Sequence, residues 1–332
     1  MRRMILTVFS AFVPVAVAFA AATGYHVLSD IQVGGEGGWD YLTVDSAARR
    51  LYVSHGTHVV VVDLDSNKVV GDVPDTPGVH GIAIAPELGK GFISNGRGNN
   101  VTIFDLKTLK ATGTVATGEN PDSIRYDAVS GRVFAFNGRS KSATAIDAKT
   151  GKAAATIPLP GKPEFSVADG KGHVFVNIED TNEIVDIDAA KGTVAKKYAL
   201  TGCDGPSGLA IDAKNRRLFS VCSNRVMAVS DPDAGKVVAT PAIGAGSDGA
   251  AFDSGTGYAF SSNGDGTLTI VQQTGGKWDV LENIATERGA RTIAVDEKTH
   301  KVYLPTAKTA PSTGGGRQSF LPNTFKVLVV GK

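Results

Sequence analysis

Seven polar residues recur along this 332-residue chain at intervals of 40 to 43 residues, and six of them can carry a charge. They are Asp40, His80, Asp122, Glu164, Ser207, Asp248 and Arg291. If a fold gathered them, the four carboxylates would repel one another, and would bind a cation or hold protons above their usual pKa. The interval therefore predicts a polar binding site. The alternative interpretation is that these residues only solvate surface loops.

Three of the six histidines lie close to the first two of these positions. His55 and His58 share one short segment, and His80 follows at the next repeat, while Asp40 precedes them. Imidazole and carboxylate groups are ligands for a divalent metal, here Zn²⁺, Ca²⁺ or Cu²⁺, with a position left for water. The alternative is that these histidines are exposed residues of turns.

Cys203 and Cys222 are the only cysteines in the chain. In an oxidising compartment such a pair is expected to form a disulfide. Two buried thiols and a thiolate metal site are the alternatives.

The N-terminus has the pattern of a secretory signal peptide. Arg2 and Arg3 precede an apolar run over Met4–Phe19, and the small residues Ala20, Ala21 and Ala22 follow. We predict that residues 1–22 are a cleaved signal peptide, that the protein is periplasmic or secreted, and that no stable membrane anchor remains. A membrane anchor is the alternative, but Pro14 interrupts the apolar run.

The composition excludes several classes of protein. Apolar residues make up 42% of the chain and charged residues 20%, which excludes intrinsic disorder, and the formal charge of +1 makes a nucleic-acid partner unlikely. The 40 glycines indicate many tight turns and hence many short strands.

A repeat of about 42 residues runs through the chain. A short apolar strand recurs seven times and ends at an anchor position, which is Asp in six copies: Asp45, Ala85, Asp127, Asp169, Asp212, Asp253 and Asp296. An aromatic residue follows each anchor by six or seven residues: Tyr52, Phe92, Phe134, Phe175, Phe219, Phe260 and Tyr303. Four strands per repeat with glycine turns predict an all-β fold, a seven-bladed β-propeller.

The ends of the chain complete this prediction. The seventh copy lacks a fourth strand, and residues 26–33 supply a spare one that would close the ring and cover a sheet edge. We expect residues 23–332 to form one domain. Its blades are predicted at about 37–75, 76–117, 118–159, 160–201, 202–244, 245–285 and 286–332, with residues 26–33 as the closing strand.

The repeat resembles the YVTN-type repeat of bacterial YncE-like proteins. The segment LYVSHG (Leu51–Gly56) is a variant of the tyrosine–valine core of that repeat, and Gly208–Thr240 is a second similar copy. The resemblance implies an exported seven-bladed propeller, often a binding protein. Members have been linked to DNA binding, which the near-neutral charge of this chain does not favour.

In a propeller, the loop before the first strand and the loop between the second and third strands open on one face. The seven recurring residues are therefore predicted at the mouth of the central channel, together with Cys203 and Cys222. An insertion at Lys308–Asn323 in the seventh blade would place Arg317 and Phe320 over the channel.

Two classes of function follow. The first is a monomeric binding protein that holds a small molecule, peptide or protein at the channel mouth, and the absence of a catalytic motif favours it. The second is a metal-dependent lactonase, hydrolase or lyase, in which Asp40, Asp122, Glu164 and Asp248 act as ligands or bases and His55 or His80 carries protons. Periplasmic metal binding or delivery is a further alternative.

Overall fold

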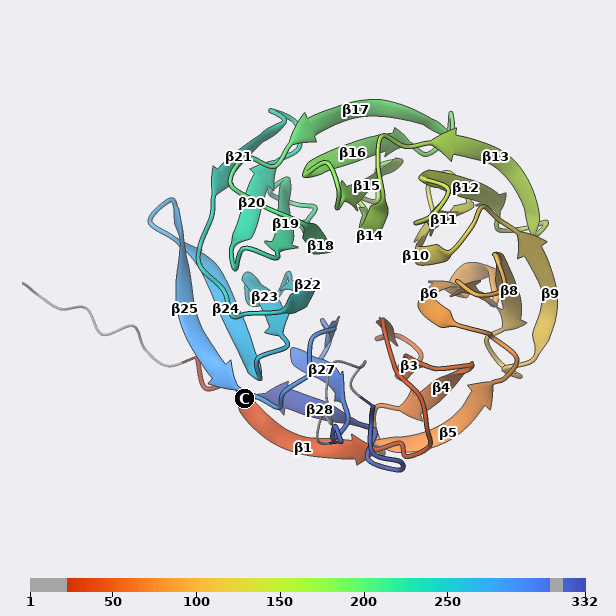
Figure 1. Cartoon of the computed structure of the whole chain (residues 1–332), viewed down its shortest axis with the longest axis horizontal. Coiled ribbons are helices and arrows are strands. Elements are labelled where there is room, and N and C mark those ends of the chain that lie inside the picture. Colours follow the sequence, from red (N-terminus) through yellow and green to blue (C-terminus); the bar gives the residue numbers. More distant parts are fainter. Residues whose placement is uncertain (1–22, 311–318) are drawn as a thin grey trace, which may run out of the picture.

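The computed structural model describes residues 23–310 and 319–332. The predicted signal peptide, residues 1–22, and Arg317 lie outside the described residues. The described chain forms seven four-stranded antiparallel sheets around a common axis, so the prediction of a seven-bladed β-propeller is confirmed (Figure 1).

The first three blades follow one another in sequence. Blade one consists of β2 (Leu42–Asp45), β3 (Arg50–His55), β4 (His58–Asp63) and β5 (Lys68–Val73). Blade two consists of β6 (Val79–Ala85), β7 (Lys90–Asn95), β8 (Asn100–Asp105) and β9 (Ala111–Ala116). Blade three consists of β10 (Pro121–Asp127), β11 (Arg132–Asn137), β12 (Ser142–Asp147) and β13 (Lys152–Pro158).

The next three blades repeat this order. Blade four consists of β14 (Pro163–Ala168), β15 (His173–Ile178), β16 (Glu183–Asp188) and β17 (Thr193–Ala199). Blade five consists of β18 (Pro206–Asp212), β19 (Arg217–Cys222), β20 (Met227–Asp231) and β21 (Lys236–Ala239). Blade six consists of β22 (Ser247–Asp253), β23 (Tyr258–Asn263), β24 (Thr267–Thr274) and β25 (Lys277–Ala285).

Blade seven joins the two ends of the chain. It consists of β26 (Ala294–Asp296), β27 (Lys301–Thr306) and β28 (Lys326–Gly331), and β1 (His26–Gln32) is its outermost strand. β1 runs antiparallel to β28, with Ile31 opposite Val327. The predicted closing strand is therefore confirmed, and it covers an edge that would otherwise be open to another chain.

The hydrophobic core lies between the blades. The seven aromatic residues of the second strands are buried, each at most 1% exposed. Seven apolar clusters each combine side chains of two neighbouring blades; one of them packs Tyr52 of blade one against Ile82 and Phe104 of blade two. Because each full burial of such a side chain is worth roughly 2 kcal/mol, the repeated aromatic accounts for the stacking of the blades.

The anchor aspartates close the turn after each innermost strand. Oδ1 of Asp45 accepts hydrogen bonds from the backbone N–H groups of Ala47 and Ala48. Ala85 cannot accept such bonds, and its turn is instead a short 3₁₀ helix, η1 (Pro86–Leu88), that ends at Gly89 with φ 63°. The one copy without an anchor aspartate therefore also has a different turn.

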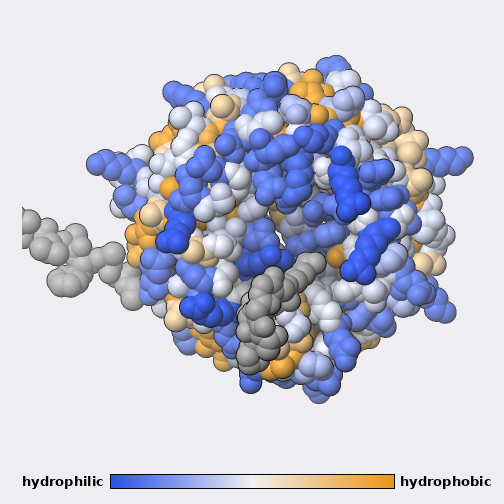
Figure 2. Space-filling model, viewed as in Figure 1, coloured by the Kyte–Doolittle hydropathy of each residue, from blue (hydrophilic) through white to orange (hydrophobic). Residues whose placement is uncertain are grey.

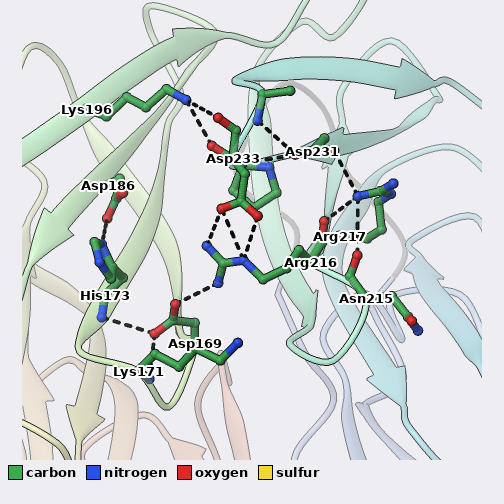
Figure 3. Close-up of polar contacts among 12 residues, drawn as sticks. Asp169, Lys171, His173, Asp186, Lys196, Asn215, Arg216, Arg217, Asp231 and Asp233 are labelled. Atoms are coloured by element: carbon green, nitrogen blue, oxygen red, sulfur yellow. Dashed lines mark hydrogen bonds and ion pairs between the residues drawn. The ribbon is translucent and has the colours of Figure 1, made fainter.

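Three anchors are also held by the adjacent blade around the ring. Arg216, four residues after its own anchor, bonds Asp233 of blade five and donates from Nη1 to Asp169 of blade four at 2.7 Å (Figure 3). Arg49 reaches Asp296 and His300 reaches Asp253 in the same way. These contacts tie blades together on the face opposite the channel mouth.

Cys203 and Cys222 form a disulfide with a Cα–Cα distance of 5.4 Å, as predicted. Both are buried, at 2% and 0% exposure. The bond indicates a compartment other than the cytoplasm. Within the described residues, we find no helix with the length and apolar character needed to cross a membrane.

Candidate cation site at the channel mouth

β-Bulges position the mouth residues. In β10, Pro121 pairs with Asn137 and Ile124 pairs with Ala135, so β10 has one extra residue at Asp122. The innermost strands of blades two, four, five and six have a register shift at the same step. A bulge re-aims a side chain that strand alternation would send to the buried face. The mouth residues of these five blades can therefore point into the channel while their neighbours pack between blades.

Asp40, His80 and Asp122 come from three successive blades and meet at one point. Nδ1 of His80 lies 2.6 Å from Oδ2 of Asp40 and 3.7 Å from Oδ1 of Asp122. One possible ligand atom of each residue lies within 4.8 Å of those of the other two residues. This is the single three-residue cluster of possible metal ligands among the described residues.

The protonation of this cluster follows from burial and charge. Burial alone would lower the pKa of His80, but the hydrogen bond to Asp40 and the charges of Asp122, Asp40 and Glu164 raise it to about 9. Burial raises the pKa of Asp122 to about 6, although the charge of His80 opposes this. At neutral pH the cluster therefore holds an imidazolium between two carboxylates.

One atom of the cluster lacks a hydrogen-bond donor. Oδ1 of Asp122 is buried and accepts no hydrogen bond from the described residues. A buried carboxylate oxygen without a donor is costly, so this atom is suited to a cation.

Glu164 lies beside the cluster and pairs with a residue that the repeat did not predict. Nζ of Lys162 is 2.5 Å from Glu164 Oε1 and 2.5 Å from Glu179 Oε2. Burial, together with the charge of Asp122, raises the pKa of Glu164 to about 8. Glu164 is therefore a carboxyl group that exchanges its proton near neutral pH.

The remaining mouth residues take other partners. Asp248 Oδ2 lies 3.4 Å from Arg291 Nε, and burial with the charge of Asp40 raises the pKa of Asp248 to about 6. Ser207 donates from Oγ to the Ser247 carbonyl at 3.3 Å. Neither Ser207 nor Arg291 offers a ligand to the cluster.

Two aromatic rings form the floor of the mouth. Tyr41 of blade one and Phe165 of blade four meet edge to face, with ring centroids 4.9 Å apart. Burial and the charges of Asp122, Asp40, Glu164 and Asp248 hold the pKa of Tyr41 well above its usual value. The four carboxylates therefore surround one phenol.

The structure separates His55 and His58 from His80 and Asp40. The His55 ring stacks on Phe325 at 4.3 Å, and burial lowers its pKa to about 4. His58 lies next to it, with ring centroids 5.0 Å apart. Neither belongs to the ligand cluster, in which Asp122 takes their place. His55 is a packed, neutral side chain because the chain before β2 and Phe325 cover it.

The described part of the insertion lies beside the mouth. Phe320 packs against Trp39 with ring centroids 4.6 Å apart, and Thr309 bridges to Phe320. Figure 2 shows hydrophilic side chains around the centre of this face.

Sequence reasoning missed Lys162, Tyr41 and Phe165, although the repeat held a signal for each. At the repeat position of Lys162, two residues before the mouth residue, the other copies have glycine or asparagine, namely Gly38, Gly78, Asn120, Gly205, Gly246 and Gly289. At the step of Tyr41 and Phe165 the others have small residues, namely Gly81, Ser123, Gly208, Gly249 and Thr292. Residues that depart from the repeat therefore mark the site as clearly as those that keep to it.

Comparisons with known proteins support the architecture. No protein-family model matches the chain, and no curated protein matches it. Among solved structures, hydrazine synthase of Kuenenia stuttgartiensis is similar, with a TM-score of 0.70 and 15% identity over 86% of this chain and 95% of that chain. At this identity the likeness shows a shared propeller fold and nothing of the activity.

Proposed function

We propose that this protein is an exported binding propeller that holds a divalent cation at its channel mouth through Asp40, His80 and Asp122. One observation carries the proposal: these ligand atoms lie within 4.8 Å of one another, and Oδ1 of Asp122 is buried without a hydrogen-bond partner. The apolar run at Met4–Phe19 and the disulfide support export. The repeat segments support membership of the YVTN-repeat, YncE-like proteins.

The donor set favours zinc. One imidazole and two carboxylates suit Zn²⁺ or Cu²⁺, whereas Ca²⁺ prefers oxygen donors alone. A bound divalent cation would supply a Lewis acid with positions open to a small ligand. In the proposed complex Asp122 contributes its unpartnered oxygen, Asp40 a second carboxylate and His80 its Nδ1.

His80 must release a proton for this role. Asp40 holds that proton on Nδ1 at 2.6 Å, and the raised pKa keeps it there at neutral pH. In the free protein, a proton on His80 thus takes the place of the cation. The resulting imidazolium reduces the repulsion between the carboxylates. Cation binding is expected to release protons.

The ligand that this proposal assigns to the site is a small molecule or peptide with an oxygen or nitrogen donor, taken up by a monomer. The Tyr41–Phe165 pair forms an apolar floor for it, and Lys162 and Arg291 flank the mouth with positive charge.

A second candidate function is hydrolysis or lyase chemistry on a lactone or ester. The observation that favours it is Glu164, whose pKa of about 8 suits a general acid or base, beside Asp122. In this candidate function Glu164 moves the proton and the cation site orients the carbonyl.

Elemental analysis and zinc titration of untagged, secreted protein test the proposal. We expect about one Zn²⁺ per chain, with affinity reduced at least tenfold in Asp122→Asn because an anionic ligand is lost. Asp279→Asn, at an exposed position outside the mouth, is the matched control. Equal affinity in both variants would exclude the site. Lactone or ester turnover that Glu164→Gln abolishes would select the second function.

A further inference from the structure

A separate cavity lies in the channel beneath the mouth. It has a volume of about 240 Å³ and is lined by the innermost strands, with apolar residues such as Leu42, Ile124 and Leu209 and polar residues such as Thr43 and Ser123. All innermost strands begin at the mouth, and these apolar residues come after Tyr41 and Phe165 along them. The aromatic pair lines the end of the cavity nearer to the four carboxylates.

One cationic residue lines this cavity. Arg125 occupies a repeat position, two residues before the anchor, at which the other blades have small or apolar residues: Thr43, Ala83, Val167, Ala210, Ala251 and Ala294. Its Nε donates to the Ser166 carbonyl at 3.0 Å, and its guanidinium lies 5.6 Å from the centroid of the Phe165 ring. These contacts fix the plane of the guanidinium.

No carboxylate of the described residues compensates the charge of Arg125. It takes part in none of their ion pairs, and its two terminal nitrogens donate no hydrogen bond to them. Burial, as the sole cause, lowers the pKa of Arg125 to about 10. Glu297 also lines the cavity but accepts its hydrogen bond from Ser254, at 2.5 Å. Arg125 is half-buried. A partly desolvated cation without a counter-charge would be stabilised by a bound anion.

The geometry points to a binding site for a small organic carboxylate, paired with Arg125 inside the channel. The planar guanidinium offers two parallel N–H groups that match a carboxylate, whereas a spherical ion would use them less well. The apolar residues of the lining can contact a short aliphatic tail, and the volume admits only a few heavy atoms. The hydroxyls of Ser123 and Ser166, 2.7 Å apart, provide further polar groups next to Arg125.

Fluorine NMR of trifluoroacetate tests this site. We expect its signal to broaden with the full-length wild-type protein and to sharpen when butyrate competes. Arg125→Met should weaken binding at least about tenfold, because a charge-assisted pair is lost. Arg139→Met makes the same change at an exposed position and should leave binding unchanged. Arg125→Lys, with charge but no planar fork, should give an intermediate affinity.

Three results would overturn the assignment: no broadening with the wild type, equal broadening in Arg125→Met, or binding of bromide but not of carboxylates. Should Arg125→Met fail to fold, wild-type crystals soaked in trifluoroacetate decide the question. Density for the carboxylate against Arg125 supports the site, and a cavity without it refutes the site. Because Asp122→Asn should leave this binding intact, the test is independent of the mouth cation.

Discussion

Nη1 of Arg49 lies 2.6 Å from Oδ2 of Asp296, and this contact joins the first blade to the seventh. The Asp296 side chain is fully buried and that of Arg49 is 14% exposed. Burial would raise the pKa of Asp296, but hydrogen bonds from Ser46, Arg49 and Thr299 lower it instead. Arg49 has φ 57°, which is a left-handed conformation. In the equivalent turns of blades two and three, glycine adopts this conformation, at Gly89 and Gly131. A strained backbone conformation thus places a cation at the junction of blades one and seven, which we call the seam of the ring.

Replacing this cation should open the seam. We expect Arg49→Met to lower the free energy of unfolding by roughly 3 kcal/mol, because Asp296 would keep a buried charge with one donor fewer. The neighbouring Arg50 pairs with Asp63 within blade one, where both side chains are more exposed. Arg50→Met, the matched control, should cost below about 1 kcal/mol. Urea denaturation measures both, and equal losses would contradict a special role for the seam.

The repeat predicts the blades because each copy encodes its own turn and its own buried aromatic. Asp45 caps a turn through its side chain, and Tyr52 is buried seven residues later, so local chemistry determines both. Closure by β1 follows as well, since the seventh copy lacks one strand. These features depend on spacing along the chain, which the sequence shows directly.

The grouping at the mouth is less visible in the sequence. The recurrence brought together Asp40, His80 and Asp122, but nothing in it separated them from His55, which packs on Phe325. That contact joins segments 270 residues apart, and in blades two to six a bulge changes the direction of the mouth residue. Such features arise from packing between blades, which a periodic pattern does not record.

The free protein should lose stability as the pH rises from about 4.5 to 9. Asp122, Asp248 and Glu164 have raised pKa values of about 6, 6 and 8, so their favourable contribution is complete below the unfolded values near 4 and is lost as the pH passes 6 and 8. His80, raised to about 9, adds stability below pH 6.5 that is lost toward pH 9. The expected fall is at least about 3 kcal/mol, because a pKa difference of about 2 between the folded and unfolded states already corresponds to that much for a single group.

Urea midpoints in the presence of a chelator, taken across this pH range, check that expectation. Asp122→Asn, which does not titrate, should show a shallower fall than the wild type. A wild-type curve that stays level or rises between pH 5 and 8 would show that burial and neighbouring charges do not raise the pKa values of the mouth carboxylates.

Zinc affinity should change with pH in the opposite direction. Because His80 must give up its Nδ1 proton, affinity should rise by roughly tenfold per pH unit between pH 6 and 8. Calorimetry in buffers of different ionisation enthalpy measures the released protons directly. His80→Gln removes that proton, so its weaker binding should vary less with pH over the same range. Proton release that persists in this variant would assign it to another group.

Close approach of neighbouring strands at the channel requires glycine at some positions. A Cβ on Gly208 would lie 2.6 Å from the Ala250 nitrogen and 2.7 Å from the Asp248 carbonyl oxygen, and both are backbone atoms that cannot move aside. Gly208→Ala should therefore destabilise the protein by about 1–3 kcal/mol. A Cβ on Gly113 would meet no atom within 4 Å, so Gly113→Ala should change stability by less than about 0.5 kcal/mol. Thermal unfolding compares them, and equal effects would show that blades five and six can separate.

The disulfide should stabilise blade five without affecting the cation cluster. Cys203 precedes β18 and Cys222 ends β19, so the bond closes a segment with a sequence separation of 19. Replacing both cysteines by alanine should lower the free energy of unfolding by roughly 3 kcal/mol, because the unfolded chain is no longer constrained. Reductant should destabilise the wild type equally and leave the double variant unchanged, since the chain has no other cysteine. Zinc affinity should remain the same, because the cluster belongs to blades one to three. A loss of zinc binding in the double variant would mean that the mouth is one cooperative unit.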